Sequence, residues 1–262
     1  MQAWHEGRES RMTDRSTVVH AHRGSERPGT LSDTGSETRP ATLSAELLDI
    51  AQRVPGFMPV DEGLALHRAA MHHLAREGSE RPLALEIGSY CGKSTLYLAA
   101  ATRACDGLAL TLDHHRGSEE HQPGWEYHDP SFVDPHTGLL DTASTFRRTL
   151  ADAGLENDVV ALVGSSVQVA SFWRTPVNVL FIDGGHTDEA ATTDYEGFAP
   201  WVRQGGALVL HDVFPNPEDG GQAPYRIYCR ALESGQFEEA WHVGSMRVLR
   251  RVADSLPTET GS

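Results

Sequence analysis

Short apolar runs alternate with longer segments of helical periodicity over most of this chain. The alternation predicts a parallel sheet with helices on both faces. The expected strands cover residues 83–87, 108–113, 159–163, 177–183 and 207–212, and the expected helices between them cover 94–103, 142–153, 167–173 and 188–202. The runs at 177–182 and 207–210 are almost wholly apolar, which is typical of strands buried on both faces.

The two ends of the chain depart from this alternation. Residues 1–40 are polar and are expected to form a disordered tail, and Met12 is an alternative start. Residues 41–262 are expected to form a single domain. Within it, 41–78 hold two helices, at 45–54 with Thr42 as N-cap and at 61–75. A helix at 224–234 precedes two strands, 237–243 and 246–252, and their short connection predicts an antiparallel hairpin.

The most informative turn lies in the sequence Leu83-Ala-Leu-Glu-Ile-Gly-Ser-Tyr-Cys-Gly-Lys-Ser, where an expected strand runs into a helix. Gly88 allows the backbone to approach a ligand closely, and the free N–H groups of the following helix face the same ligand. A phosphate-binding P-loop needs four residues between its first glycine and the Gly-Lys pair, but only three separate Gly88 from Gly92. The turn therefore favours a nucleoside cofactor, and a plain strand-to-helix connection is the alternative.

Asp113 and the segment after it carry the next candidate chemistry. Asp113 ends the second expected strand about 20 residues beyond the glycine turn, where an acid can accept hydrogen bonds from ribose hydroxyls. The segment 114–138 is unusually long for a connection. Its Trp125 and Tyr127 suit stacking on a sugar, and a surface excursion with local packing is the alternative.

Acids and histidines follow the fourth and fifth expected strands, at the edge of the sheet where ligands bind in doubly wound folds. These residues are Asp183, His186, His211 and Asp212. Aspartate and histidine are good ligands for a divalent cation. With a pKa near about 6.5, His186 or His211 is also suited to accept a proton from an alcohol. The plain alternative is that Asp183 binds an amine and His211 packs against a helix.

The composition and net charge of the chain bear on its binding partners and on its cellular compartment. The chain has 262 residues, 39% of them hydrophobic, and a formal net charge of −15 at pH 7. The negative charge disfavours nucleic acids as partners. No apolar run approaches the roughly 20 residues of a membrane span, and no signal peptide is visible. The three cysteines show no disulfide or metal spacing, which favours the cytoplasm.

Three motifs together resemble class I S-adenosylmethionine-dependent methyltransferases: Glu86-x-Gly-x-x-x-Gly, Phe181-Ile-Asp-Gly-Gly-His and Gly205-Gly-x-Leu-x-x-His-Asp-Val. The resemblance covers about residues 83–252. It implies a Rossmann-like, doubly wound, seven-stranded α/β sheet that is parallel except for one antiparallel strand of the C-terminal hairpin. In this family the loop after the third strand passes the adenine, and acids after the fourth and fifth strands can hold magnesium.

The same resemblance implies roles for individual residues. The expected cofactor-binding residues are Glu86, Gly88, Ser89, Gly92, Ser94, Asp113, Ser165 and Asp183. The expected catalytic residues are Asp183, His186 and His211, and the expected ligands of Mg²⁺ are Asp183, His211 and Asp212. Val213 stands where catechol-type members have a further oxygen ligand, so dependence on magnesium is left open.

A closer resemblance lies in Pro55-Gly-Phe-Met-Pro-Val-Asp-Glu and Asp113-His-His-Arg-Gly-Ser-Glu-Glu. These segments are similar to an actinomycete group linked to methylated glucose polysaccharides, with the sugar 6-hydroxyl as the methylated position. The resulting hypothesis is a sugar O-methyltransferase with a small-molecule or oligosaccharide acceptor, and a homo-oligomer is left open. The alternatives are an O-methyltransferase of a natural product, a non-catalytic cofactor-binding protein, and an NAD-dependent oxidoreductase, whose Gly-x-Gly-x-x-Gly the turn lacks.

Overall fold

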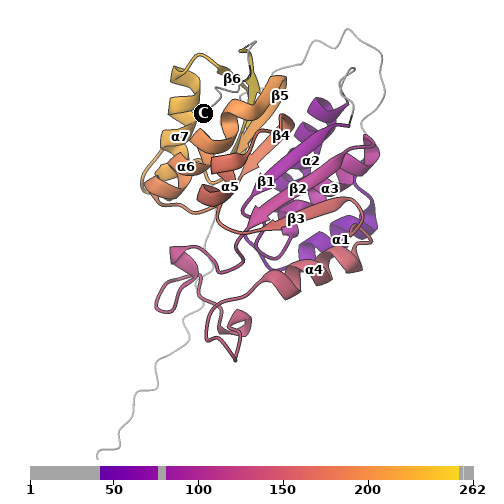
Figure 1. Cartoon of the computed structure of the whole chain (residues 1–262), viewed down its shortest axis with the longest axis vertical. Coiled ribbons are helices and arrows are strands. Elements are labelled where there is room, and N and C mark those ends of the chain that lie inside the picture. The colour runs from indigo at the N-terminus through magenta and orange to yellow at the C-terminus, as the bar shows by residue number, and fades with distance from the viewer. Residues whose placement is uncertain (1–41, 76–80, 254–255, 257–262) are drawn as a thin grey trace, which may run out of the picture. The chain divides into compact units, whose positions relative to one another are not determined.

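A seven-stranded sheet forms the centre of the fold. The computed structural model of the protein describes residues 42–75, 81–253 and 256, and its strands lie in the order β3-β2-β1-β4-β5-β7-β6 (Figure 1). Strands β1 to β5 are parallel, and β7 is antiparallel to both β5 and β6. The predicted fold class is therefore confirmed. The strands are β1 Leu83–Ile87, β2 Leu108–Asp113, β3 Val159–Val163, β4 Val177–Ile182, β5 Val202–Leu210, β6 Phe237–Val243 and β7 Met246–Arg251.

The register of the sheet brings the carboxyl ends of four strands to one edge. Ile87 of β1 pairs with Leu112 of β2 and with Ile182 of β4, and Ile182 pairs in turn with Leu210 of β5. The polar residues that follow these positions therefore meet at this edge, although they are far apart in the sequence.

Helices pack on both faces of the sheet (Figure 1). They are α1 Ala45–Arg53, α2 Val60–Leu74, α3 Lys93–Ala104, α4 Ala143–Asp152, α5 Ser166–Phe172, α6 Asp188–Phe198 and α7 Ala223–Glu233. One apolar cluster joins α1 to α4 with sheet residues such as Val179 and Phe181, and the other joins α5 to α7 with residues such as Leu180 and Leu208. The two clusters follow from the alternation of side chains across β4 and β5.

Two expectations about element ends were wrong. Ser44, and not Thr42, caps α1, because the Ser44 side chain accepts a hydrogen bond from the backbone N–H of Leu47. Helix α6 ends at Phe198 and a 3-10 turn, Ala199–Trp201, leads directly into β5. Strand β5 thus begins at Val202, before the predicted start. The prediction missed the first half of β5 because this half is polar and glycine-rich and gives no apolar run.

The N-terminal helices lie beside the sheet. Helix α2 contacts α3 and the strands β1, β4, β5 and β6, and its first turn reaches the edge where the parallel strands end. A cap formed by residues 41–78 remains a prediction, as does the single domain. The expected tail at 1–40 lies outside the described residues, as do residues 76–80.

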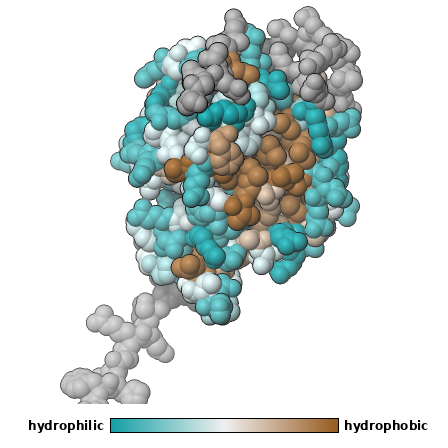
Figure 2. Space-filling model, in the orientation of Figure 1, coloured by the Kyte–Doolittle hydropathy of each residue, from teal (hydrophilic) through white to brown (hydrophobic). Residues whose placement is uncertain are grey.

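The half of the sheet around β3 carries exposed apolar side chains. Val160 and Val163 on β3 are 42% and 69% exposed, and Val167 and Phe172 on α5 are 61% and 67% exposed. Figure 2 shows hydrophobic residues gathered over the part of the sheet that contains β1, β2 and β3. Monomeric proteins rarely leave such surface uncovered, so this face is a candidate contact surface.

Candidate active site

The turn after β1 requires glycine. Gly88 and Gly92 have φ angles of 86° and 91°, which favour a residue without a side chain. A Cβ on Gly88 would also lie 2.2 Å from the carbonyl oxygen of Asp183. Glycine therefore lets the end of β1 lie directly against the end of β4.

Asp113 closes this turn from the end of β2. Its Oδ2 accepts hydrogen bonds from the backbone N–H groups of Ser89 (2.9 Å) and Tyr90 (2.8 Å), and its Oδ1 accepts one from His115 (2.7 Å). A carboxylate has about four acceptor positions. Asp113 thus holds the glycine turn in shape and keeps acceptor capacity for a ligand.

The Gly-Lys-Ser sequence does not form a phosphate site. Lys93 Nζ donates to the carbonyl oxygen of Gly56 (2.9 Å), and Ser94 Oγ donates to Glu86 (2.5 Å). Glu86 is fully buried beneath the turn, where Thr95 also donates to it. Burial raises the pKa of Glu86 to about 8, although the two hydroxyl donors oppose the rise. Glu86 therefore supports the turn as a predominantly protonated acid at neutral pH.

A cavity of about 600 Å³ opens at the edge where the parallel strands end. Its size suits a cofactor. Four predicted cofactor residues line it: Gly88, Asp113, Ser165 and Asp183. A smaller cavity of about 90 Å³ is lined by Ser89 and Ser94 and also by Gly88, Asp183, His186, His211 and Asp212. The structure thus brings six of the predicted cofactor residues to the two cavities, whereas Glu86 and Gly92 line neither.

His211 lies between carboxylates from three elements. Its Nε2 donates to Glu62 (2.6 Å) and its Nδ1 to Asp183 (3.0 Å), and Asp212 Oδ2 is 3.3 Å from Nδ1. Burial alone would lower the pKa of His211, but Asp183, Asp212 and Glu62 raise it well above the usual value. His211 is therefore a buried cation, with both ring nitrogens engaged by carboxylates.

Glu62 is the partner of His211 that the sequence did not reveal. It lies in the first turn of α2 and also accepts hydrogen bonds from the backbone N–H and the hydroxyl of Ser245 (2.6 and 3.1 Å). Burial raises the pKa of Glu62, but His211 and Ser245 outweigh burial and the net shift is downward. An acid in the first turn of a helix is common in any protein, so only the fold identifies this one as part of the site.

His186 lies between two further carboxylates. Its Nε2 is 3.2 Å from Asp212 and its Nδ1 is 3.1 Å from Glu120. The hydrogen bond to Asp212 raises the pKa of His186 to about 9, against the effect of burial. Burial raises the pKa of Asp212, but His186 and His211 together hold it well below its usual range. Asp212 also has a φ of 53°, a backbone conformation that is uncommon for residues other than glycine.

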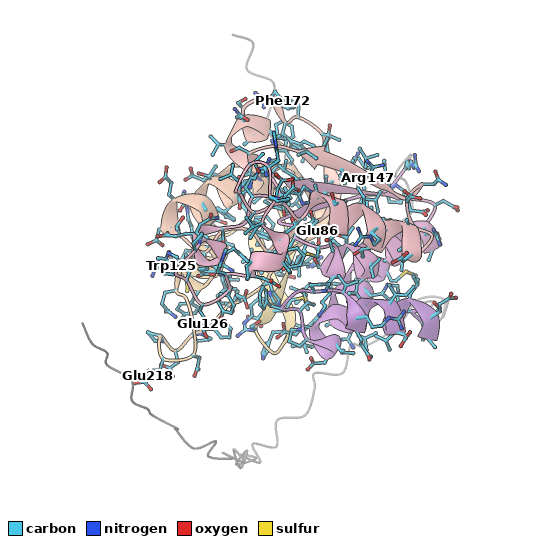
Figure 3. The ribbon with its side chains drawn as sticks, turned by 90° about the horizontal axis from the view of Figure 1, so that it is seen from below. Glu86, Trp125, Glu126, Arg147, Phe172 and Glu218 are labelled. Carbon is cyan, nitrogen blue, oxygen red and sulfur yellow. The ribbon has the colours of Figure 1, made fainter. Side chains whose placement is uncertain are left out.

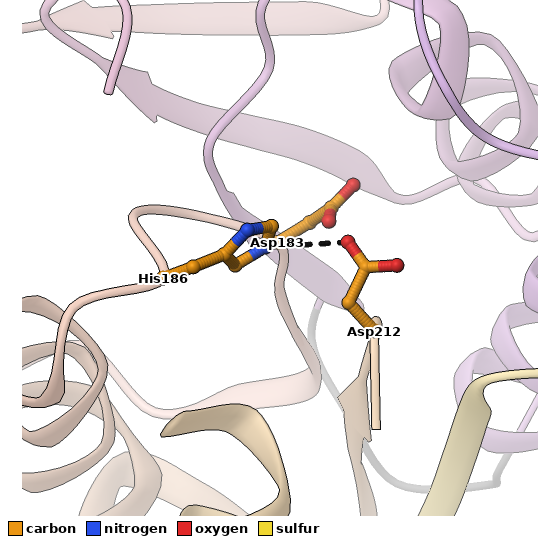
Figure 4. A group of neighbouring side chains, drawn as sticks. All are labelled: Asp183, His186 and Asp212. Atoms are coloured by element: carbon orange, nitrogen blue, oxygen red, sulfur yellow. Dashed lines mark ion pairs between the residues drawn. The ribbon is translucent and has the colours of Figure 1, made fainter. Parts of the chain in front are cut away.

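Among the residues that the structure describes, Asp183, His186 and Asp212 form a group that could hold a metal ion. Their donor atoms lie within 4.8 Å of one another (Figure 4). Two carboxylates and one imidazole are suitable ligands for a divalent cation. The predicted ligand set contained His211, whereas this group contains His186; His211 Nδ1 nevertheless lies 3.0 Å from Asp183 and 3.3 Å from Asp212.

Aromatic side chains from the segment 114–138 lie over the glycine turn. The rings of Phe57 and Tyr127 are 4.9 Å apart between centroids, and those of Tyr90 and His121 are 5.0 Å apart. Trp125 is 53% exposed, lines the larger cavity and lies at the periphery of the molecule (Figure 3). The segment is therefore packed against the site and offers exposed rings at its mouth.

Comparisons with known proteins agree with this fold. Residues 85–213 match a family model described as a methyltransferase domain. Similar solved structures include cofactor-bound Rv0187 from MTB (20% identity, 80% of this chain and 89% of that chain, TM-score 0.56). A methyltransferase from Podospora anserina, PaMTH1, bound to SAH, is also similar (15% identity, 82% and 91%, TM-score 0.57). The O-methyltransferase NovP is a third (16% identity, 74% and 81%, TM-score 0.54).

The family match covers residues 85–213, just under half of the chain, and the seven-stranded sheet agrees with a methyltransferase fold. These findings support the predicted enzyme class, a methyltransferase. At these identities the solved structures support the fold, and the acceptor has to be inferred from the site itself.

Proposed function

We propose that the protein transfers a methyl group from S-adenosylmethionine to a hydroxyl oxygen of a sugar. The observation that carries this proposal is the single edge at which the glycine turn, Asp113 and the histidine–carboxylate wall meet. In the proposed pose Gly88 and Ser89 would hold the methionine, Asp113 would accept hydrogen bonds from the ribose hydroxyls, and Ser165 would face the adenine. This pose directs the methyl group toward the smaller cavity.

S-adenosylmethionine supplies an electrophilic methyl group when it is bound. The acceptor oxygen forms a bond to the methyl carbon as the carbon–sulfur bond breaks, and sulfur keeps the electron pair. Positioning dominates such a transfer, so the rigid wall of His211, Asp183 and Asp212 is assigned to orientation. His186 is assigned as the acceptor of the hydroxyl proton at Nδ1, where the acceptor hydroxyl would take the place of Glu120, and Asp212 at Nε2 would stabilise the imidazolium that forms.

A second candidate for activation of the hydroxyl is a divalent cation such as Mg²⁺. The geometry of Asp183, His186 and Asp212 favours it, and a cation bound there would lower the cost of removing the hydroxyl proton. In that arrangement His186 is a ligand and not a base. Removal of divalent cations with EDTA separates the two: turnover is retained with His186 as the base and lost with a metal.

The acceptor is proposed to be an oligosaccharide. The exposed rings of Phe57, Trp125 and Tyr127 at the mouth of the site suit stacking against sugar rings. The 6-hydroxyl of glucose units in a methylated polysaccharide is the acceptor that the sequence resemblance suggests. A hydroxyl of a smaller natural product is the alternative, because exposed aromatic rings would also suit stacking against a flat aglycone.

The surroundings of the enzyme are part of the proposal. A homo-oligomer is proposed because Val160, Val163, Val167 and Phe172 leave apolar surface exposed, and a cytoplasmic location is proposed from the cysteine usage. The described ranges contain no helix of the length and hydrophobicity that a bilayer crossing requires. The net charge of −15 leads us to propose no nucleic-acid partner.

Two measurements test the function. Calorimetry should show binding of S-adenosylhomocysteine and none of NAD, and binding of NAD alone would support the oxidoreductase alternative. Mass spectrometry should then show a mass increase of one methylene on glucose oligosaccharides incubated with S-adenosylmethionine. Methylation of natural-product phenols but of no sugar would contradict the proposed acceptor and leave the cofactor assignment intact.

A further inference from the structure

Asp194 is a buried acid to which the proposed chemistry gives no role. It lies on α6 and is 2% exposed. Its Oδ1 is buried and has no hydrogen-bond partner. No other buried carboxylate oxygen in the part of the chain that the structure describes lacks a partner. Burial raises the pKa of Asp194 to about 6, although a hydrogen bond with Ser166 opposes the rise. An acid in this position costs stability, so a compensating role is expected.

The position of Asp194 links two loops of the larger cavity. It contributes to the cavity wall together with Ser166, which follows β3, and Gly184, which follows β4. A Cβ on Gly184 would lie 2.7 Å from Asp194 Oδ2. The carboxyl group therefore lies directly under the backbone after β4, beside the loop toward which the adenine of the proposed pose points.

The other acids of this cavity are less suited to bind a nucleobase. Asp113 already accepts three backbone hydrogen bonds, and Glu120 and Asp183 contact histidines. The remaining two acids of the cavity are both exposed: Glu119 and Glu189. Asp194 alone combines burial with an oxygen that lacks a partner. A ligand with a hydrogen-bond donor would satisfy it.

We propose that Asp194 accepts a hydrogen bond from the exocyclic amino group of the cofactor's adenine and thereby selects adenine over a 6-oxopurine. The proposal rests on the cofactor pose described under the proposed function. A 6-oxopurine presents a carbonyl oxygen where adenine presents the amino group, so the carboxylate would face an acceptor and remain unsatisfied. Buried polar groups that lose their partner discriminate strongly between such ligands.

The test compares two nucleosides on three proteins. Calorimetry would give the affinities of the unaltered protein, Asp194→Asn and Asp194→Ala for S-adenosylhomocysteine and for S-inosylhomocysteine, its 6-oxopurine analogue. We expect the unaltered protein to prefer the adenine compound by about 10- to 100-fold, the effect of a charge-assisted hydrogen bond. Asp194→Asn should reduce this preference at least about tenfold, because an amide can also donate to a carbonyl oxygen.

Asp194→Ala and a matched control complete the design. Asp194→Ala should weaken binding of the adenine compound and leave binding of the inosine compound nearly unchanged. Glu189→Gln, an exposed acid of the same helix that also lines the cavity, should alter neither affinity. An unchanged preference in Asp194→Asn would overturn the inference.

A thermal melt separates recognition from a structural role. If Asp194 serves the ligand, Asp194→Asn should leave the melting temperature without ligand unchanged or higher, because the buried oxygen has no partner to lose. A lower melting temperature together with an unchanged nucleoside preference would assign Asp194 to the packing of the two loops. Failure of the unaltered protein to bind either nucleoside would instead overturn the cofactor pose, and this inference with it.

Discussion

Glu62 and Asp194 show how differently the two ends of the site are built. Both are almost fully buried, with 4% and 2% of their surface exposed. Glu62 faces the imidazolium of His211 and its pKa is lowered. Among the described residues no cationic side chain pairs with Asp194, and burial raises the pKa of Asp194 to about 6. Burial raises the pKa of any carboxyl group. Whether the net pKa shift is upward or downward therefore depends on whether a cationic or hydrogen-bonding partner lies beside the carboxyl group.

The acceptor end is therefore complete without a ligand. Glu62, His211, Asp212, His186 and Glu120 form a chain in which each imidazole lies between two acids. Each imidazole in this row of contacts is thus held by a carboxylate at each of its two ring nitrogens. At the nucleoside end, by contrast, a buried carboxylate oxygen lacks a partner. Taken with the proposed cofactor pose, the comparison leads us to expect a preorganised wall for the chemistry and a cavity that the cofactor would complete.

The largest expected effect is at His186. His186→Ala should lower kcat by about 10²- to 10⁴-fold, the usual contribution of a general base, and leave the affinity for S-adenosylhomocysteine unchanged. Because the pKa of His186 is raised to about 9, the neutral, proton-accepting form increases as the pH rises, so kcat of EDTA-treated unaltered enzyme should increase up to about pH 9. Stopped turnover assays between pH 6 and 10 would measure this.

The exposed His242 provides the control for this prediction. It pairs with Glu239 on β6 and lines neither cavity, so His242→Ala should keep full activity. Unchanged kcat in His186→Ala would remove His186 from the reaction and favour a different proton acceptor.

The second largest effect is expected at Glu62. Glu62→Gln leaves the buried imidazolium without one counter-charge, which should cost about 3 kcal/mol of unfolding free energy and lower kcat by roughly 10- to 100-fold. The pKa of Glu62 is lowered and that of His211 is raised, so the contribution of the pair is lost as the pH falls through the lowered pKa or rises through the raised one. Denaturant unfolding at pH 6, where both groups are charged, would measure the full contribution of the Glu62–His211 pair to the free energy of unfolding.

Ser245→Ala is the matched control, because it removes the hydroxyl donor to Glu62 and leaves His211 paired. Its loss of stability should be smaller and its kcat nearly unchanged. Equal effects of the two variants on kcat would contradict the special role of the Glu62–His211 contact.

A smaller effect is expected at Asp113. Asp113→Asn should weaken binding of S-adenosylhomocysteine by about tenfold, because an amide is a weaker acceptor for the ribose hydroxyls and for the N–H groups of Ser89 and Tyr90. Calorimetry at a fixed salt concentration would measure this loss of affinity for S-adenosylhomocysteine. An affinity equal to that of the unaltered protein would show that the ribose is held elsewhere.

The smallest effect is expected at Glu86. Its pKa is raised to about 8, so the folded state holds a proton that the unfolded state releases above about pH 4.5, and this contribution to stability falls as the pH rises through 8. Glu86→Gln should therefore be more stable than the unaltered protein at pH 9 by on the order of 1 kcal/mol, or roughly 2–4 °C in Tm. Glu218→Gln, on an exposed loop, should show no such pH dependence.

Much of the fold and part of the site could be predicted because their signals are local. The apolar runs predicted the end of β2 at Asp113 and placed the ends of β4 and β5 within two residues of their observed ends, Ile182 and Leu210. The glycine turn follows from Gly88 and Gly92. The polar first half of β5 has no apolar run, so the sequence did not reveal it. It belongs to the strand because the chain pairs with β4 from Val202 onward, and such pairing depends on the adjacent strand and not on the apolar pattern of β5 itself.

The sequence by itself determined the order of strands and helices, the glycine turn and the rim on which the acids and histidines gather, because apolar periodicity and glycine act over a few residues. Only the tertiary structure decided which acid meets which histidine. Glu62 and His211 are 149 positions apart and touch because α2 packs on the sheet beside the end of β5. The charge and pKa of a buried side chain depend on such contacts, and no local pattern encodes them.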